Sequence, residues 1–393
     1  MTIPSTKKSS RLSSRVQAIQ PSGIRRFFDL ASKMENIISL GVGEPDFVTP
    51  WNVREASISS MERGFTSYTA NAGLLELREA IAGYMVDRFS VTYDPETEIL
   101  VTVGASEAID IGMRAILDPG DEVIIVEPSF VSYAPLVELA GGVAVPVGTE
   151  ISDNFQVSAA QIEKAVTSRT KAIMLCFPNN PTGATMGEKE LKEIALLAER
   201  HDLIVFSDEI YAELTYDEEH FCFSRIEGMK ERTVLISGFS KSFAMTGWRL
   251  GFVMAPPDLL AAMLKIHQYS LMCAPTMAQF GALEALRSGM DDLERMKQSY
   301  KQRRNFFVKS FAEIGLTCHT PGGAFYAFPS IRSTGLSSEQ FAEKLLMEER
   351  VAVVPGHVFG EGGEGHIRCS YATSMENLEE SVKRMNRFLK KYK

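Results

Sequence analysis

The feature that most restricts the fold is a regular alternation of strand and helix patterns between residues 98 and 288. Short apolar runs bounded by turn-forming residues are typical of buried strands. The candidate strands are Glu98–Val103, Glu122–Glu127, Val143–Val147, Lys171–Phe177, Leu203–Ser207, Thr233–Ser237 and Leu250–Met254. Helical patterns lie near 105–117, 130–140, 158–167, 187–200 and 257–288. This alternation predicts an α/β fold with a central, mainly parallel, seven-stranded sheet flanked by helices.

The length of the chain predicts more than one domain, because 393 residues exceed what one ordinary core holds. After residue 290 a long charged helix pattern leads into a region of mixed strands and helices. We therefore expect a disordered tail over 1–14, an N-terminal segment over 15–45 that packs with the small domain, a large domain over 46–290 and a small α+β domain over 291–393.

Composition and charge exclude several classes of function. The net charge of −9 argues against binding of nucleic acid or anionic membranes, and no apolar run approaches the roughly 20 residues of a membrane span. Five scattered cysteines indicate reduced thiols in the cytoplasm, and neither they nor the six histidines make a metal-ligand pattern. The basic first 28 residues fit a transit peptide or a solvated tail, and we favour the tail.

One lysine and one arginine follow the sixth candidate strand. Small residues carry Lys241 into a loop, and Arg249 stands eight positions further along, before the seventh strand. A lysine amine whose charge is suppressed forms a Schiff base with an aldehyde, and the planar fork of an arginine suits a phosphate. Pyridoxal 5′-phosphate (PLP) carries both groups. Taken alone, this lysine and arginine are equally compatible with two unrelated charges on the protein surface that bind no cofactor.

Further candidates stand where other strands end, since ligands of parallel sheets collect beyond the carboxyl ends of the strands. Gly104-Ala-Ser106 opens a helix and is either an anion site or an ordinary cap. Phe130 either stacks on a flat heterocycle or belongs to the core. Asn180 stands in a turn between prolines, and Asp208 would pair with a protonated ring nitrogen or cap a helix.

Together these motifs resemble the class I/II aminotransferase family, whose members are PLP-dependent enzymes of fold type I. The resemblance covers nearly the whole chain from about residue 15, with the motifs in family order. The motifs are Gly43-Glu-Pro-Asp46, Tyr68 with Gly73, Gly104-Ala-Ser106, Pro178-Asn-Asn-Pro-Thr-Gly183, Asp208-Glu-Ile-Tyr211, Ser240-Lys241, Gly247-Trp-Arg249-Leu-Gly251 and Arg368.

The resemblance implies a role for each of these residues. Lys241 would hold PLP as a Schiff base and later shuttle a proton, while Asp208 would pair with the ring nitrogen and Tyr211 with the ring oxygen. Arg368 would clamp the carboxylate of the substrate. The other implied cofactor contacts are Gly104, Ala105, Ser106, Phe130, Asn180, Ser240, Arg249 and Tyr68, and the other substrate contacts are Gly41 and Asn180. No metal is implied.

The resemblance also implies that the protein forms dimers, and at one position the sequence departs from the family pattern. Tyr68 would reach the cofactor of a neighbouring subunit, which implies a homodimer with shared sites. Many relatives carry a hydroxyl three residues before the lysine, whereas this chain has Gly238 at that place. We expect Ser237 or Ser240 to substitute for the missing hydroxyl.

The implied reaction is transamination, in which the amino group of an L-amino acid passes to a 2-oxo acid such as 2-oxoglutarate. A PLP-dependent β-lyase or cyclopropane-forming synthase of the same fold is an alternative. A nicotinamide dehydrogenase lacks support because no Gly-x-Gly-x-x-Gly follows the first strand. A DNA-binding regulator lacks support because a tail of about 14 residues is too short to form a DNA-binding segment.

The identity of the amino donor depends on weaker signals. By family position Phe325, Tyr326 and Ile24 would line the substrate pocket, which favours an aromatic or broad-range donor. Aspartate is the alternative donor. Arg114 is then a candidate partner for an acidic side chain, although a solvated helix charge explains it equally simply.

Overall fold

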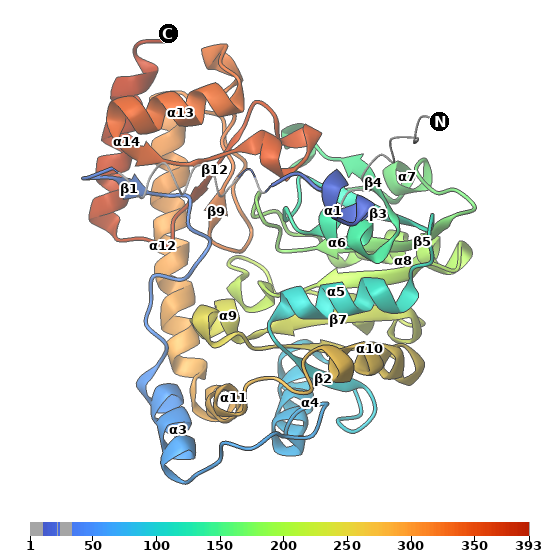
Figure 1. The fold of residues 1–393 in the computed structure, drawn as a ribbon. Helices are drawn as coiled ribbons and strands as arrows, with labels where there is room; N and C mark the ends of the chain where they lie inside the picture. Colours follow the sequence, from blue (N-terminus) through green and yellow to red (C-terminus); the bar gives the residue numbers. More distant parts are fainter. Residues whose placement is uncertain (1–10, 22, 24–33, 393) are drawn as a thin grey trace, which may run out of the picture.

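The computed structural model describes residues 11–21, 23 and 34–392, and one sheet of seven strands lies at its centre (Figure 1). The strands are β2 (Ile99–Thr102), β3 (Glu122–Glu127), β4 (Val143–Gly148), β5 (Thr170–Cys176), β6 (Ile204–Asp208), β7 (Thr233–Gly238) and β8 (Gly251–Met254). Their spatial order is β2-β8-β7-β6-β5-β3-β4. All seven predicted strands are confirmed, and their ends differ from the prediction by no more than about one residue.

The sheet is mainly parallel, as predicted. β3 pairs in parallel with β4 and β5, and β6 pairs in parallel with β5 and β7. β8 runs antiparallel to both of its neighbours, with Gly251 opposite Gly238 of β7 and Thr102 of β2. β8 therefore begins at the edge of the sheet where the other six strands end, and the residues just before it lie at this edge too.

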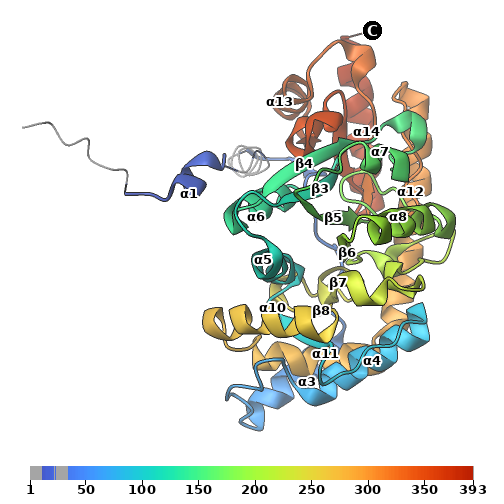
Figure 2. The same ribbon diagram turned by 90° about the vertical axis from the view of Figure 1, so that its right-hand side faces the viewer.

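Helices cover both faces of the sheet (Figure 2). One face carries α5 (Ala105–Ile116), α6 (Tyr133–Ala140) and α10 (Pro257–Ser270), and the other carries α4 (Leu75–Phe89), α8 (Glu188–Arg200) and α11 (Thr276–Ser288). Neighbouring strand residues serve opposite faces: Ile124 packs in the cluster of α8 and Ile125 in the cluster of α5. The other helices of this part of the chain are α3 (Trp51–Glu62), α7 (Ala159–Glu163) and α9 (Phe239–Ser242).

The single helix predicted over 257–288 is wrong, because the structure has two helices there, α10 and α11. After α10 ends at Ser270, Met272 adopts a positive φ of 66°. Pro275 then precedes α11, and a proline has no N–H to continue a helical ladder. The apolar periodicity continues through the break, so periodicity alone predicts one helix.

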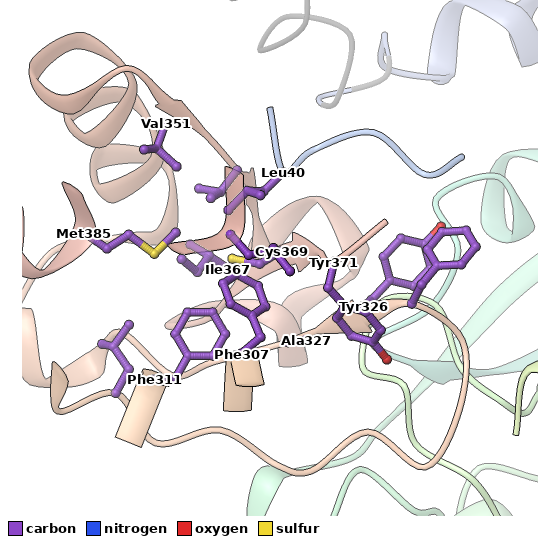
Figure 3. Packing of buried hydrophobic residues seen from close by; sticks show 14 of the residues in the cluster. Leu40, Phe307, Phe311, Tyr326, Ala327, Val351, Ile367, Cys369, Tyr371 and Met385 are labelled. Carbon is purple, nitrogen blue, oxygen red and sulfur yellow. The ribbon is translucent and has the colours of Figure 1, made fainter. Parts of the chain in front are cut away.

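From α12 (Met290–Ile314) onward the chain builds a smaller α+β unit. Its other elements are β9 (Tyr326–Ala327), α13 (Ser338–Glu349), β10 (Val351–Ala352), β11 (Val354–Pro355), β12 (Ile367–Ser370) and α14 (Met375–Leu389). β12 pairs antiparallel with both β11 and β9. These elements enclose a core of buried side chains, several of which Figure 3 shows: Phe307, Phe311, Val351, Ile367, Cys369, Tyr371 and Met385.

The first strand of the chain joins this smaller unit. β1 (Ile38–Ser39) pairs in parallel with β10, and Leu40 is fully buried in the core that Figure 3 shows. A short helix, α1 (Ser14–Ala18), lies further upstream. Most of the predicted tail over 1–14, and Ile24, lie outside the described residues. No helix in the described part of the chain is long and apolar enough to cross a membrane.

Candidate active site

A cavity of about 690 Å³ lies at the edge of the sheet where six strands end and β8 begins. The N-terminal segment and the smaller unit contribute to its walls, so residues as far apart as Gly41 and Arg368 meet there. The predicted site residues that line it are Gly41, Ala105, Ser106, Phe130, Asn180, Asp208, Tyr211, Ser240, Lys241, Arg249 and Arg368. Gly104 and Tyr68 do not line it, nor do the further candidates Ser237, Arg114 and Phe325.

Lys241 reaches the cavity from α9, directly after β7. Its Nζ donates a hydrogen bond of 2.6 Å to the main-chain carbonyl of Gly43. Loss of surrounding water lowers the pKa of the amine to about 8. The positive charges of Arg368 and Arg249 act in the same direction, and the carboxylate of Glu44 opposes them. The folded chain thus holds an amine that loses its proton close to neutrality, as a nucleophile or base requires.

Arg249 lies just before β8 and adopts a left-handed conformation with φ of 53°. Its Nη1 donates to the carbonyl of Thr246 at 3.0 Å. The guanidinium packs directly on Gly104, where an added Cβ would lie 2.7 Å from Nη2. Helix α5 begins at Ala105, which lines the same cavity. A guanidinium beside the free N–H groups of a helix N-terminus is suited to a phosphate.

Close packing between β7 and β8 explains why position 238 is a glycine. A Cβ on Gly238 would lie 2.8 Å from the Cα of Gly251, closer than real side chains approach a neighbouring backbone. A hydroxyl-bearing residue would therefore force β7 and β8 apart. Of the two serines expected to substitute, Ser240 lines the cavity, whereas Ser237 does not, and its hydroxyl lies 3.5 Å from the carbonyl of Glu209.

Asp208 ends β6 and is only 4% exposed. Its Oδ1 accepts a hydrogen bond from the N–H of Ile210 at 3.2 Å, and its Oδ2 accepts one from the hydroxyl of Tyr133 at 2.6 Å. Burial raises the pKa of this carboxyl to about 6, against the effect of these two donors. A cationic partner in the cavity would favour the ionised carboxylate.

Arg368, on β12, is buried where the two units meet. Its Nη1 donates to Asn180 Oδ1 at 2.9 Å, and its Nη2 donates to the carbonyl of Gly41 at 2.7 Å. The guanidinium carbon lies 4.5 Å from the ring centroid of Tyr326 and 5.0 Å from that of Phe359. Nε is buried and has no hydrogen-bond partner among the described residues. A carboxylate is the ligand that such a fixed, desolvated fork suits.

Two tyrosines lie on the same side of the cavity. The hydroxyls of Tyr211 and Tyr326 are 2.9 Å apart, and burial together with this neighbour raises the pKa of Tyr211 well above its ordinary value, so it stays a neutral donor. The prediction that Phe325 lines the pocket is wrong for this cavity. Its ring is fully buried behind the site, edge-on to Tyr211 at 5.6 Å. Phe325 stands in a turn, after Ala324 with a positive φ of 58°, whereas Tyr326 begins β9.

Two further candidates lie away from the cavity of their own chain. Tyr68 is 76% exposed. Arg114 does not line the cavity but forms an ion pair of 3.0 Å with Asp110, one turn earlier on α5, and its side chain is 48% exposed. The solvated helix charge is therefore the interpretation of Arg114 that the structure favours.

Sequence reasoning missed five residues that line the cavity, namely Val42, Ile109, Tyr133, Cys176 and Thr246. Tyr133 stands three residues after Phe130, and this spacing was an available signal, since one turn of chain brings both rings to the same place. Ile109 and Cys176 are apolar residues of a helix and a strand, and their pattern is that of core residues. Among the described residues there is no cluster of His, Cys, Asp or Glu that could hold a metal ion.

Comparison with known families settles the relationship of the chain. A family model described as "Aminotransferase class I and II" matches residues 35–385. The chain belongs to this family. Fold, motifs and cavity thus describe a PLP-dependent aminotransferase of fold type I.

Relatives of known name cover almost the whole chain. The "Putative aminotransferase YugH" of Bacillus subtilis is 65% identical over 97% of this chain and 99% of its own length. An aspartate aminotransferase of Pyrococcus abyssi is 46% identical over 97% of this chain and 99% of its own. The crystal structure of an aromatic aminotransferase from Pyrococcus horikoshii superimposes with a TM-score of 0.89 at 46% identity, covering 94% of this chain and 99% of that one.

The cavity fits the PLP that members of this family use. The weakly basic amine of Lys241 suits its aldehyde, and the guanidinium of Arg249 beside the N-terminus of α5 suits its phosphate. The buried carboxylate of Asp208 would gain the cationic partner it lacks from a protonated ring nitrogen. When bound, PLP supplies an electron sink for the charge that develops at the α-carbon of an amino acid.

We expect the amine of Lys241 in the cofactor-free chain to titrate near pH 8 rather than near its ordinary 10.5. Brief acetylation over a pH series, read by peptide mass spectrometry, would show a midpoint near pH 8, and Arg368→Met should raise it by removing a cation. Between these two pH values the unfolded chain keeps a proton that the folded chain has lost. This residue therefore makes the free energy of unfolding rise with pH through that window. A midpoint near 10.5 would contradict the expectation.

Proposed function

We propose that the enzyme transfers the amino group of an aromatic or broad-range apolar L-amino acid to a 2-oxo acid such as 2-oxoglutarate. The family establishes the transamination, and the donor class is the proposal. The observation that carries it is the set of charges around the cavity. In the described lining the cations are Lys241, Arg249 and Arg368.

Each of these cations has a proposed use that every amino-acid substrate shares. Arg249 holds the phosphate, Lys241 forms the covalent bond to the cofactor, and Arg368 binds the α-carboxylate. An acidic side chain would need a fourth cation, which the described lining does not contain, and it would also meet the carboxylate of Glu44. A carboxylate left without a partner in such a site is costly.

The remaining walls favour a flat apolar side chain. Ile109, Phe130 and Tyr326 line the cavity together with the charged residues. Aromatic and aliphatic walls stabilise an aromatic ring by area and by edge contacts. Phe130 is proposed to lie on the face of the cofactor ring, which leaves Ile109 and Tyr326 for the substrate.

Aspartate is the second candidate donor, and the relatives support it to the same extent. Proteins named aspartate aminotransferase and aromatic aminotransferase both match this chain at 46% identity. Overall identity therefore does not discriminate between them, and the cation set is the observation on which the proposed preference rests. The second carboxylate of 2-oxoglutarate meets the same lining, so the acceptor also has to be measured.

The proposed work of the protein groups follows from their geometry. Arg368, with Asn180 and Gly41 beside it, orients the substrate so that its α-hydrogen faces Lys241. The amine of Lys241 removes this proton and later returns one, since its pKa of about 8 leaves it partly neutral near pH 7 to 8. Asp208 stabilises the positive charge on the ring nitrogen, and Tyr211 donates to the ring oxygen.

We also propose the division of the chain and its compartment. The N-terminal segment over 15–45 belongs with the small unit, which the pairing of β1 with β10 supports, and the large and small domains meet near residue 290, where α12 begins. All five cysteines are unpaired, which supports a reducing compartment such as the cytoplasm.

A homodimer with shared sites completes the proposal. Tyr68 is strongly exposed and does not line the cavity of its own chain. Other large apolar side chains are exposed on neighbouring elements of the same part of the molecule: Trp51, Ile58, Met61, Phe65, Tyr269, Leu271 and Met272. An apolar surface of this kind is typical of an interface between subunits.

A panel of donors tests the substrate class. With 2-oxoglutarate or pyruvate as acceptor, we expect kcat/KM for phenylalanine to exceed that for aspartate by about tenfold or more, because the aspartate side chain lacks a cation. Coupled assays of 2-oxo acid release would measure both. Faster turnover of aspartate than of phenylalanine would overturn the donor class and favour the second candidate.

Arg368→Ala should lower kcat/KM about a hundredfold for every amino acid, mainly through KM, since a charge-paired fork to the carboxylate is lost. Arg114→Ala is the matched control, because that arginine is ion-paired outside the cavity and its loss should leave KM unchanged. An unchanged KM in Arg368→Ala would remove Arg368 from the carboxylate site.

Mixed dimers test whether Tyr68 acts on the neighbouring subunit. Tyr68→Ala and Lys241→Ala chains should each be impaired alone. A dimer with one chain of each kind contains one site with an intact Lys241 and an intact Tyr68 from the other chain. Co-refolding equal amounts should therefore restore about a quarter of the wild-type rate, as random pairing predicts. No recovery above the two variants measured separately would show that Tyr68 acts within its own chain, and full activity of Tyr68→Ala alone would show that it does not act at the site.

A further inference from the structure

The carboxylate of Asp208 has one side-chain donor besides the N–H of Ile210. The hydroxyl of Tyr133 lies 2.6 Å from Oδ2, whereas the N–H of Ile210 lies 3.2 Å from Oδ1. An ionised carboxylate can only accept, so the tyrosine donates. Hydrogen bonds from neutral donors to ionised groups are among the strong ones in proteins.

Tyr133 is held rigidly in place to make this contact. Tyr133 is 1% exposed and is the first residue of α6, and its N–H donates to the carbonyl of Phe130 at 3.1 Å. Its ring meets that of Phe130 edge-on, with centroids 5.6 Å apart. Burial, and then the negative charge of Asp208, raise the pKa of the phenol well above its ordinary value, so the hydroxyl keeps its proton.

The other titratable groups around Asp208 do not replace this donor. Cys176, on β5, has a thiol whose pKa is raised by burial, and the thiol lies 3.6 Å from the carbonyl of Pro178. Lys241, on α9, exerts a favourable charge, but its Nζ donates to Gly43. Oδ2 therefore depends on Tyr133 within the described structure.

Glu209, the next residue on the chain, carries a negative charge that would disfavour a second one at Asp208. Its carboxylate points elsewhere: Oε2 lies 2.7 Å from His220 Nε2, and Oε1 accepts from the hydroxyl of Ser207 at 2.8 Å. Although burial opposes ionisation, the contact with His220 helps to keep the pKa of Glu209 below its ordinary value. Two buried carboxylates thus stand side by side, each with its own partners.

We propose that Tyr133 is a positioning residue for Asp208, whose hydroxyl keeps that carboxylate ionised and aimed at the ring nitrogen of PLP. The proposal rests on the proposed role of Asp208. Without the hydroxyl, Oδ2 loses its donor and the buried carboxylate binds a proton more readily. A smaller fraction of the Asp208 carboxylate is then ionised beside the ring nitrogen, so PLP is held less tightly and its nitrogen is less protonated.

The test is Tyr133→Phe in the full-length protein. Its affinity for PLP should fall about tenfold, which corresponds to one charge-assisted hydrogen bond. The affinity for 1-deaza-PLP, in which a C–H group replaces the ring nitrogen, should change less than about twofold. In holoenzyme loaded with ¹⁵N-labelled PLP, the ring-nitrogen chemical shift should move toward the unprotonated value.

Tyr84→Phe is the matched control. It removes a hydrogen bond of 2.7 Å from a half-buried tyrosine to the carboxylate of Glu213, outside the lining of the cavity. In Tyr84→Phe the ratio of the affinity for PLP to the affinity for 1-deaza-PLP should stay at the wild-type value. An equal loss for PLP and the analogue in Tyr133→Phe, with an unmoved ¹⁵N shift, would overturn the proposal, since a packing defect acts on both ligands alike.

Asp208→Asn distinguishes the proposed role of Tyr133 from the proposed role of Asp208, on which it rests. The substitution should abolish the preference for PLP over the deaza analogue, and adding Tyr133→Phe should then change the ratio by less than about twofold. A preference that survives Asp208→Asn would refute the role of Asp208 itself. A preference lost in Asp208→Asn but intact in Tyr133→Phe would refute only the role of Tyr133.

Discussion

A close approach of three backbone segments at the edge of the sheet holds the site together. Gly251, at the start of β8, lies so near Gly104 and Ala105 that an added Cβ would come within 2.7 Å of the Ala105 nitrogen. Gly238, at the end of β7, lies equally close to Gly251. These contacts bring the N-terminus of α5, the loop of Arg249 and the turn that carries Lys241 into one cradle. Side chains at the contact points would separate them.

The second constraint is the removal of charged groups from water. Lys241, Asp208 and Arg368 are each desolvated by the cavity walls, and the first two have pKa values displaced toward neutrality as a result. Backbone carbonyls at Gly41 and Gly43, rather than counter-ions, meet the two cations. The groups are thus kept reactive toward an incoming aldehyde, nitrogen or carboxylate, because none of them is neutralised by another within the protein.

Much of this was predictable from the sequence, because strand periodicity and the residues that follow each strand are local signals. All seven strands of the central sheet were found, and most predicted site residues lie in one cavity. What the sequence could not show depends on direction and packing. The apolar period continues through the break between α10 and α11, where Pro275 was the one local signal. Phe325 stands in a turn, where no periodicity indicates the side to which a ring points.

Tyr133 shows the same limit at the level of a single contact. Its spacing from Phe130 indicates that the two rings lie together, but only the turn that begins α6 brings its hydroxyl to a strand end 75 positions away. The start of α5, in contrast, was predictable as a candidate anion site, because a glycine followed by small residues at the beginning of a helix is a local pattern. Long-range polar contacts are the part of a site that single-sequence reasoning finds last.

The pairing of β1 with β10 has a consequence for how the protein is made. Ile38 and Leu40 are synthesised well before their partners around Val351 and Ser370, which lie more than 300 positions further along the chain. The carbonyls of Gly41 and Gly43 cannot take their positions until then. The large sheet can form before the segment around Val351 and Ser370 is made, whereas the finished pocket needs that segment, because the N-terminal strand pairs with it.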